Sequence, residues 1–254
     1  MPLVTTPAII LQAFRYAETS KIVRLATREH GVQSAIAKGA SRPKSRFGAS
    51  LQVLTEGMAH LYLKATTDLQ TLAAFDVTEQ RPGLATDLER YAAASALAEV
   101  MLRCAPAEPH PQLFELLATR LDRLATLPAA QVGPAGIAGL WALVRALGFA
   151  PALDRCAREG DDLADGTVGF SVPDGGMLCA RCTRESRTTV LEPGDRAALC
   201  GLATGDDAIP DGWSAPHAAA HRRLLARFIR HHLAEERGFK ALDFWETPPW
   251  HSTS

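Results

Sequence analysis

The pattern of apolar and polar positions changes its period once along the chain, near residue 80. Before that point, short runs rich in Ile, Val and Thr partly alternate with polar residues, which is the pattern of half-buried β-strands. Gly57 interrupts the fourth run, as at a bulge or bend. The expected strands are Ala8–Tyr16, Lys21–Arg28, Val32–Lys38, Leu51–Lys64 and Leu69–Thr78. These five strands predict a small, partly open barrel of the OB type, a fold that binds oligonucleotides on one face and in its loops.

After residue 80 the apolar residues recur at the three- and four-residue spacing of helices. Thr86 to Glu89 is a capping box, in which the Thr86 hydroxyl and the Glu89 carboxylate can each accept a hydrogen bond from a free amide. The expected helices are about 86–104, about 112–127, 134–148, one after Pro193, and about 216–236. The C-terminal segment, with Trp245 and Trp250 among prolines, is expected to be a strap on the surface.

Residues 154–190 interrupt the helical pattern with three of the five cysteines of the chain. A hairpin over Phe170–Cys179, turned at Asp174-Gly175-Gly176, would place Cys179 and Cys182 in a tight turn, as in a zinc ribbon. A second thiolate pair is incomplete, because Glu159 stands three residues after Cys156. The candidate metal ligands are therefore Cys156, Glu159, Cys179 and Cys182. The alternative is a metal-free insert that keeps the fold.

The chain is thus expected to be an α+β protein in four parts. Residues 1–80 form the barrel, 81–153 the first part of a helical domain, 154–190 the ribbon-like insert, and 191–254 the rest of the helical domain and the tail. The net charge of −1 is uneven, because residues 1–80 carry 9 Lys/Arg and 6 Asp/Glu whereas residues 81–254 carry 18 and 22. That asymmetry predicts a polyanion site confined to the N-terminal part.

The strongest concentration of positive charge is the segment KGASRPKSRF, residues 38–47, and no Asp or Glu lies between Glu29 and Glu56. Its Gly and Pro residues exclude a regular helix or a central strand, so a mobile loop is expected. The four cations are Lys38, Arg42, Lys44 and Arg46. Either the loop is only a solvated surface feature, or it binds nucleic acid. Phe47 could stack on an unpaired base or anchor the loop.

The sequence gives little support for a catalytic site, a histidine metal site or a membrane segment. The sequence has no Walker A loop, no G-x-G-x-x-G, no G-x-S-x-G and no H-E-x-x-H. His217 and His221 have the i,i+4 spacing of metal ligands, but without an acidic third ligand nearby in sequence they are interpreted as a solvated helix face. No secretory signal precedes the first strand, and the longest apolar run, residues 135–144, is shorter than the roughly 20 residues of a membrane helix. A cytoplasmic protein is expected.

Three segments resemble the RecO family of bacterial recombination and DNA-repair proteins. They are AKGASRPKSRFGASLQ (37–52), LGFAPALDRCAREG (147–160) and FSVPDGGMLCARC (170–182). The resemblance spans nearly the whole chain. It departs at Glu159, where many members carry a zinc-binding cysteine.

The resemblance implies a function: binding single- and double-stranded DNA, annealing complementary strands, and working at the nucleoid with RecR and the single-strand-binding protein to load RecA. It also implies docking of the acidic, aromatic-ended tail of single-strand-binding protein, which needs an apolar pocket and a cation. Two helices could supply this docking site. The favoured candidate is the third helix, with Trp141 for the pocket and Arg145 for the cation. The other is the last helix, with Arg223 and Arg227 beside Leu225 and Phe228.

Two other functions compete with this one. A general single-strand-binding or RNA-binding adaptor would share the barrel and the basic loop. A zinc-dependent enzyme is the weakest reading, since a site filled by protein ligands leaves no position for water.

Overall fold

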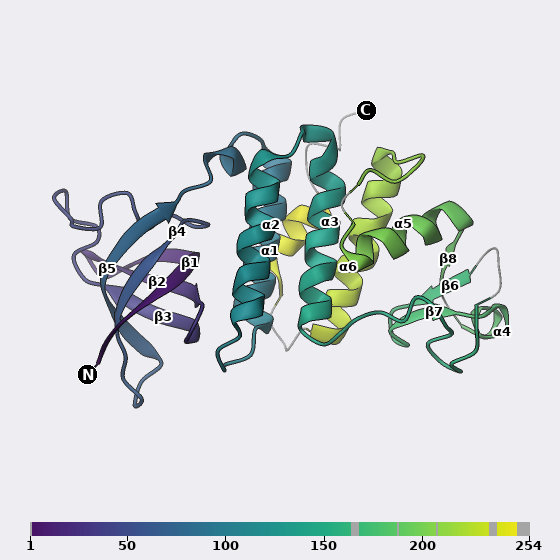
Figure 1. Ribbon diagram of the computed structural model, residues 1–254, viewed down its shortest axis with the longest axis horizontal. Helices are drawn as coiled ribbons and strands as arrows, with labels where there is room; N and C mark the ends of the chain where they lie inside the picture. The colour runs from purple at the N-terminus through teal and green to yellow at the C-terminus, as the bar shows by residue number, and fades with distance from the viewer. Residues whose placement is uncertain (1, 164–167, 187, 207, 234–237, 248–254) are drawn as a thin grey trace. The chain divides into compact units, whose positions relative to one another are not determined.

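The computed structural model of the chain describes residues 2–163, 168–186, 188–206, 208–233 and 238–247. The chain divides into two compact units. The first combines residues 1–86 with 98–125, and the second combines 87–97 with 126–254. Helix α1, Leu88–Cys104, contributes residues to both units. The first unit contains a β-barrel and the second is mainly helical, so the α+β class is confirmed (Figure 1).

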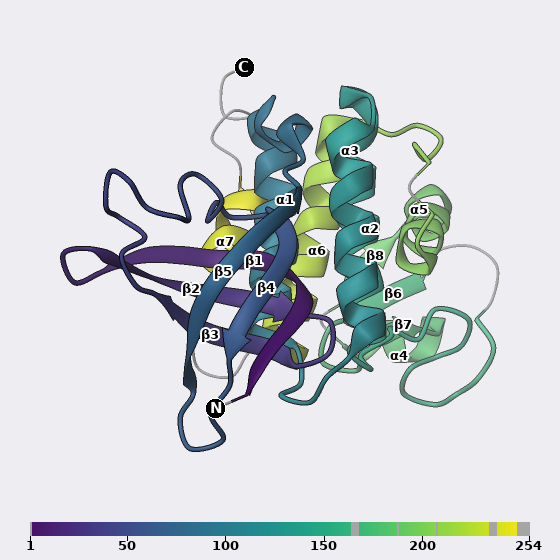
Figure 2. The same ribbon diagram turned by 60° about the vertical axis from the view of Figure 1, so that its left-hand side comes forward.

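The N-terminal barrel is closed and its strands follow the order β1-β2-β3-β5-β4 (Figure 2). Every neighbouring pair is antiparallel except β3 with β5, which is parallel. The strands are β1 (Leu3–Tyr16), β2 (Ser20–Thr27), β3 (Gly31–Ala37), β4 (Glu56–Tyr62) and β5 (Leu69–Glu79). The expected five-stranded barrel is therefore confirmed.

Two strand boundaries differ from expectation. Strand β1 begins at Leu3 rather than Ala8, because residues 3–9 pair with β4. Strand β4 begins at Glu56 rather than Leu51, and Leu54 has a positive φ of 71°, which a strand does not use. Gly57 lies at a register shift between β4 and β5, where a Cβ would stand 2.4 Å from the Asp76 carbonyl oxygen. The bulge expected at Gly57 is confirmed.

The barrel core is built from inward-facing residues at alternate positions, as the two-residue period of a strand requires. Small alanines are interspersed with larger aliphatic side chains, and Phe47 and Leu51 of the loop before β4 complete the cluster. Its main strand residues are Ala8, Ile10, Val23, Leu25, Ala35, Ala37, Ala59, Leu61 and Leu72.

Helix α2 (Pro111–Thr126) packs its apolar face in the first unit, and Arg81 joins it to the barrel. The buried Arg81 guanidinium pairs with Glu56 of β4 at 2.5 Å and with Asp122 of α2 at 2.6 Å. A short 3₁₀ helix, Pro82–Ala85, leads into α1.

The cap of α1 differs from the expected capping box. The Arg90 backbone amide donates a hydrogen bond to Asp87 Oδ1 at 2.8 Å. The Thr86 hydroxyl instead donates a hydrogen bond to the Gly83 carbonyl oxygen. Asp87 is therefore the cap, because the preceding turn engages the Thr86 side chain.

In the second unit α3 packs against α5 and α6, and α6 packs against α7. Their bounds are α3 (Ala129–Ala146), α5 (Pro193–Thr204), α6 (Ala215–Leu233) and α7 (Lys240–Glu246). Helix α3 starts before Pro134, which costs it one hydrogen bond near its N-terminus. Trp245 lies in α7 and is 1% exposed, so the expected surface strap is wrong there. Trp250 lies outside the described residues.

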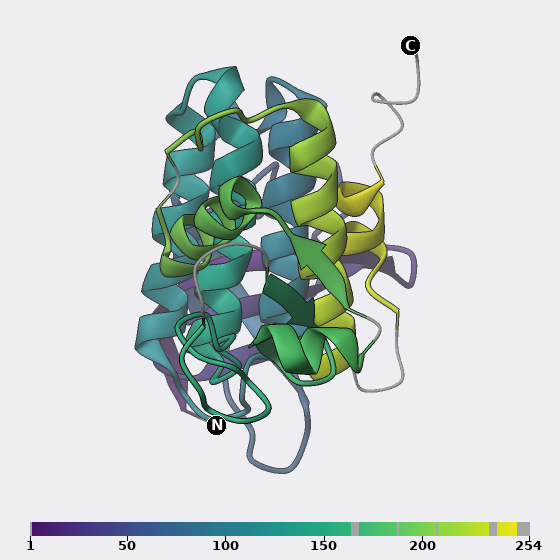
Figure 3. The ribbon, with the colours of Figure 1, turned by 90° about the vertical axis from the view of Figure 1, so that its right-hand side faces the viewer.

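The insert is a three-stranded sheet of order β7-β6-β8 with the short helix α4 (Figure 3). Its elements are β6 (Val168–Ser171), β7 (Gly176–Leu178), α4 (Ala180–Arg184) and β8 (Thr189–Leu191). Gly175 has a φ of +77°, which glycine adopts readily, and it closes the expected hairpin. Among the described helices, none combines the length and the apolar composition that crossing a membrane requires.

Candidate nucleic-acid interface and metal site

The basic loop, residues 38–50, follows β3 and precedes β4 in the chain. Its four cations, Lys38, Arg42, Lys44 and Arg46, are all exposed. Backbone hydrogen bonds shape the loop from within, such as the one from the Ser50 amide to the Phe47 carbonyl oxygen at 2.8 Å. The Ser41 amide donates to the carbonyl oxygen of Thr19, outside the loop, at 2.9 Å. The loop thus presents positive charge from a fixed attachment to the turn between β1 and β2.

Phe47 anchors this loop. Its ring is 3% exposed and belongs to the barrel core, and the Arg46 guanidinium carbon lies 5.2 Å from the ring centroid. A ring enclosed by the core leaves no exposed face for a base, so of the two roles offered for Phe47 this structure supports the anchor. The hydrophobic effect decided between its two roles, because burying a phenyl ring is worth about 2 kcal/mol.

Two exposed aromatic residues precede the turn to which the loop is attached. Phe14 and Tyr16 are 44% and 48% exposed at alternate positions near the end of β1. The bond from Ser41 to Thr19 attaches the basic loop to the turn that follows these residues. The sequence did contain a signal for them: two aromatic residues with strand periodicity immediately precede a turn.

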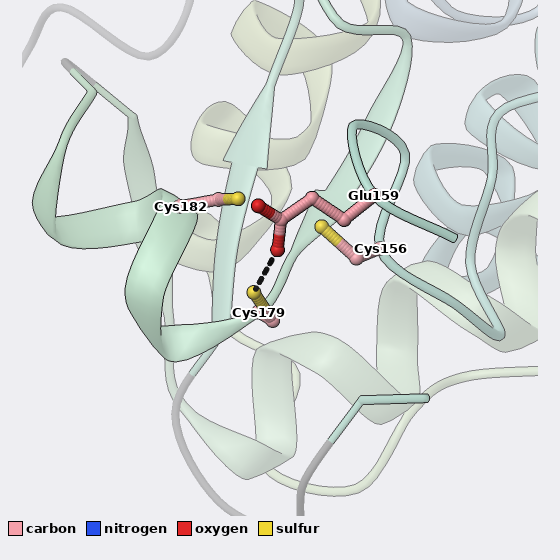
Figure 4. A group of neighbouring side chains, drawn as sticks. All are labelled: Cys156, Glu159, Cys179 and Cys182. Carbon is pink, nitrogen blue, oxygen red and sulfur yellow. Dashed lines mark hydrogen bonds between the residues drawn. The ribbon is translucent and has the colours of Figure 1, made fainter. Parts of the chain in front are cut away.

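The predicted metal ligands converge in the insert. One ligand atom from each of Cys156, Glu159, Cys179 and Cys182 lies within 4.8 Å of all the others. Figure 4 shows the four side chains pointing toward one another, with Cys182 on α4 and Cys179 just before it. Cys156 and Cys182 are buried, and Glu159 Oε2 lies 3.7 Å from Cys179 Sγ.

The thiols of Cys156 and Cys182 in this cluster have pKa values shifted in opposite directions. Burial raises the pKa of Cys156, but hydrogen bonds from the backbone of Cys179, Glu159 and Arg158 outweigh it and bring that pKa down to about 7. Burial, together with hydrogen bonds to Cys179 and Glu159, raises the pKa of Cys182 to about 12 in the absence of a metal. Three thiols and a carboxylate are a donor set that fits Zn²⁺.

Arg181 constrains the fourth member of this set. Its guanidinium pairs with Glu159 at 2.5 Å. Burial raises the pKa of Glu159, but hydrogen bonds from Cys182 and Arg181 and the charge of Arg181 lower it overall. The carboxylate is therefore ionised and is held in the ion pair with Arg181.

The residues predicted to dock a partner tail lie on two helices, Trp141 and Arg145 on α3 and Arg223 and Arg227 on α6. Trp141 is 0% exposed and packs edge-on against Phe228, with ring centroids 5.1 Å apart, so in this structure its ring offers no surface to a partner. Arg145 Nη1 donates to the Ala203 carbonyl oxygen at 3.2 Å. Arg223 and Arg227 are exposed one turn apart on α6.

Comparison with known proteins covers almost the whole chain. Residues 1–81 match the family model described as Recombination protein O N terminal, and residues 85–241 match Recombination protein O C terminal. The chain is 35% identical over 241 residues to the DNA repair protein RecO of Anaeromyxobacter sp. (strain K), covering 92% of each. It is 32% identical over 241 residues to the DNA repair protein RecO of Pelobacter propionicus, covering 93% of this chain and 94% of that one. The chain belongs to the RecO family of DNA repair proteins.

Proposed function

We propose that this protein is a DNA-binding recombination mediator: it binds single- and double-stranded DNA, anneals complementary strands and helps to load the recombinase. The observation that carries the proposal is the exposed basic loop attached to a closed barrel. Its role is binding and positioning, without catalysis. It acts in the cytoplasm at the nucleoid, with RecR and single-strand-binding protein as direct partners and RecA as an indirect one.

Charge and geometry support the loop as the phosphate-binding element. All four cations are exposed and no carboxylate lies between Glu29 and Glu56. Each phosphate contact releases condensed counterions, which makes affinity fall as salt rises.

Phe14 and Tyr16 support contact with unpaired bases. Base stacking on an exposed ring contributes about 1–3 kcal/mol per base and tolerates any sequence. They precede the turn to which the loop is attached, which would let one strand meet phosphate-binding and base-stacking groups together.

The first prediction concerns the salt dependence of DNA binding. Changing Lys38, Arg42, Lys44 and Arg46 to alanine should flatten the log–log slope for single-stranded DNA by about 3, from roughly 0.7 per phosphate contact. Fluorescence anisotropy of a labelled oligonucleotide over a series of salt concentrations measures the slope.

A matched control removes four exposed cations from the second unit, with the same change in net charge. The control residues are Arg155, Arg184, Arg223 and Arg227. The salt slope of DNA binding should flatten in the loop variant and stay unchanged in the control. The opposite result would move the DNA site to the second unit.

Annealing separates a mediator from a general single-strand-binding adaptor. A mediator should anneal complementary strands that are already coated with single-strand-binding protein. An adaptor should bind the free strands but leave the coated strands apart.

The second prediction concerns the tail of single-strand-binding protein. The electrostatic half of its site is assigned to Arg223 and Arg227, because Arg145 is engaged with Ala203. Changing both arginines of α6 to alanine should weaken binding of a tail peptide about tenfold, the loss of roughly one charge-assisted contact. Arg145→Ala should bind the peptide like the parent. Equal binding by all three proteins would place the tail elsewhere.

A further inference from the structure

Two thiols of the cluster, Cys179 and Cys182, share the first turn of helix α4. Cys179 is the N-cap of this helix and Cys182 is its third residue. Side chains at these two positions lie on the same side of a helix start, as they do in a capping box. Among the described residues, the Cys179 side chain makes no capping hydrogen bond, and Figure 4 shows both sulfurs directed into the cluster. The two sulfurs therefore face one another across a single turn of chain.

The backbone holds the two cysteines at a distance that a disulfide can span. The dihedral angles of the two residues between them, Ala180 and Arg181, set the separation of their Cα atoms, and both residues are helical. Helix geometry gives a separation of about 5 Å. Disulfides join Cα atoms that lie about 4.4–6.8 Å apart. The two sulfurs lie within 4.8 Å of each other, so side-chain rotation alone can bring them together.

Hydrogen bonds on both sides of Cys179 fix this backbone. The Thr183 amide donates to the Cys179 carbonyl oxygen at 2.9 Å, and the Thr183 hydroxyl donates to the same oxygen at 2.9 Å. Before Cys179, Leu178 of β7 pairs with Gly169 of β6. The pair is thus positioned by the fold of the insert and needs no rearrangement of the chain to close.

Burial gives the three thiols of the cluster different access to solvent. Cys156 is 1% exposed and Cys182 is 0% exposed, whereas Cys179 is half-buried. A small oxidant dissolved in water therefore reaches Cys179 first, because oxidation follows exposure of the sulfur. Cys182 lies next to it as a second thiol that can resolve the oxidised sulfur, an arrangement typical of redox-sensitive cysteines.

Glu159 makes these thiols more open to oxidation than those of a four-cysteine zinc site. The carboxylate lies 3.7 Å from Cys179 Sγ and is held by Arg181 at 2.5 Å. A carboxylate is a harder ligand than a thiolate and suits Zn²⁺ less well, so the metal protects the sulfurs less. A disulfide and a metal would use the same two sulfurs and would exclude each other.

We propose that Cys179 and Cys182 are a modification site, at which a peroxide forms a reversible disulfide within the insert. The Cys179 thiolate sulfur attacks one peroxide oxygen, the O–O bond breaks, and Cys179 is oxidised to a sulfenic acid. Hydrogen peroxide is reduced, and the hydroxide that leaves takes up the proton of the Cys179 thiol as water. The Cys182 sulfur then attacks the Cys179 sulfur, the S–O bond breaks, and a second water leaves with the proton of Cys182. A dithiol reductant reverses the product to two thiols.

Oxidation of the intact, reduced and metal-stripped chain with hydrogen peroxide tests the proposal. Trypsin cleaves after Arg158, Arg181 and Arg184, so the three thiols of the cluster fall on separate peptides. Mass spectrometry without reduction should find peptide 159–181 linked to peptide 182–184. The parent should lose two of its five thiols first, and dithiothreitol should restore them.

Variants separate the attacking thiol from the resolving one. Cys179→Ala should form no disulfide in the insert and should lose thiols at least about tenfold more slowly, since the reachable sulfur is gone. Cys182→Ala should form no disulfide either, but its Cys179 should accumulate as a sulfenic acid that dimedone traps. Cys156→Ala should keep the link between the two peptides.

Cys200→Ser is the matched control, because it removes a half-buried thiol of α5 that lies outside the cluster. It should form the disulfide at the rate of the parent. Zn²⁺ in excess should slow formation of the link at least about tenfold in the parent, since both sulfurs are then metal ligands.

The linkage found in the parent chain decides the matter without any variant. A main product that joins Cys156 to either of the other two thiols would overturn the proposal. So would oxidation of Cys104 or Cys200 as fast as that of Cys179, which would mean that exposure alone controls reactivity. A rate that excess Zn²⁺ leaves unchanged would contradict the shared use of the two sulfurs.

Discussion

Replacing Arg81 with alanine is expected to destabilise the barrel unit by about 3–5 kcal/mol, the cost of breaking a buried ion pair from one side. The Arg81 side chain is 3% exposed, and it bonds to Glu56 at 2.5 Å and Asp122 at 2.6 Å. Its Nη1 also lies 3.5 Å from the Leu54 carbonyl oxygen. Removing it leaves the Glu56 carboxylate, which is 20% exposed, without its cation.

Hydrogen exchange of the amides in β1–β5 is a suitable measurement, because it reports on the barrel separately from the other unit. The most protected amides should exchange at least a hundredfold faster in Arg81→Ala, which corresponds to the lower end of the expected range. Arg155→Ala is the control: its side chain is 60% exposed and its pair with Asp154 spans 3.7 Å, so it should change stability by less than about 0.5 kcal/mol.

The double change Arg81→Met with Glu56→Gln tests the mechanism. It removes both charges while keeping most of the side-chain volume, so it should be more stable than Arg81→Ala. If the double variant is as unstable as the single one, neither the lost volume nor the unpaired Glu56 carboxylate carries the loss, and the contacts of Arg81 with Asp122 and the Leu54 carbonyl oxygen do. Unchanged barrel exchange in Arg81→Ala would contradict the role of this residue altogether.

The barrel could be predicted from the sequence because its pattern is local. The alternation of apolar and polar residues in a strand can be seen within a few positions, and the glycine at position 57 is itself the signal for the bulge there. The thiol cluster was predictable for the same reason, since the hairpin places Cys179 and Cys182 within one turn of chain.

Burial of individual aromatic rings was not predictable, because it depends on the partner surface rather than on neighbours in sequence. Phe47 sits in a polar, basic segment and Trp245 among prolines, yet each is at most 3% exposed. Trp141 fills the helical core, where the sequence equally allowed a partner pocket. In each case tertiary packing decided.

The same limit applies to groups that meet across elements. Asp195 approaches His217 and His221 only because α5 and α6 lie close together, and no spacing in the sequence encodes that distance. The N-terminal cap of α1 is a smaller example of the same kind. Thr86 and Asp87 are both good capping residues, and Asp87 is the cap because Thr86 is hydrogen-bonded in the preceding turn.

Zinc binding by the thiol cluster should be weak in the natural sequence and much stronger in Glu159→Cys. A carboxylate is a harder ligand than a thiolate and suits Zn²⁺ less well in a structural site. Arg181 adds to this difference, because its 2.5 Å ion pair competes with the metal for Glu159. Exchanging this ligand for a thiolate should raise the affinity about a hundredfold.

The measurement is zinc content after purification without chelator, followed by competition with a chelator of known affinity. The parent should hold substoichiometric zinc, and Glu159→Cys should approach one equivalent. Glu185→Cys, which adds a thiol at an exposed glutamate at the end of α4, is the control and should resemble the parent.

Arg181→Ala separates the two causes of weak binding. If competition by the guanidinium matters, removing it should raise zinc affinity while Glu159 stays in place. If only the hardness of the carboxylate matters, Arg181→Ala should have the zinc affinity of the parent, and only Glu159→Cys should bind zinc more tightly. Full, chelator-resistant zinc in the natural sequence would contradict both causes, because a fourth ligand other than Glu159 would then have to complete the site.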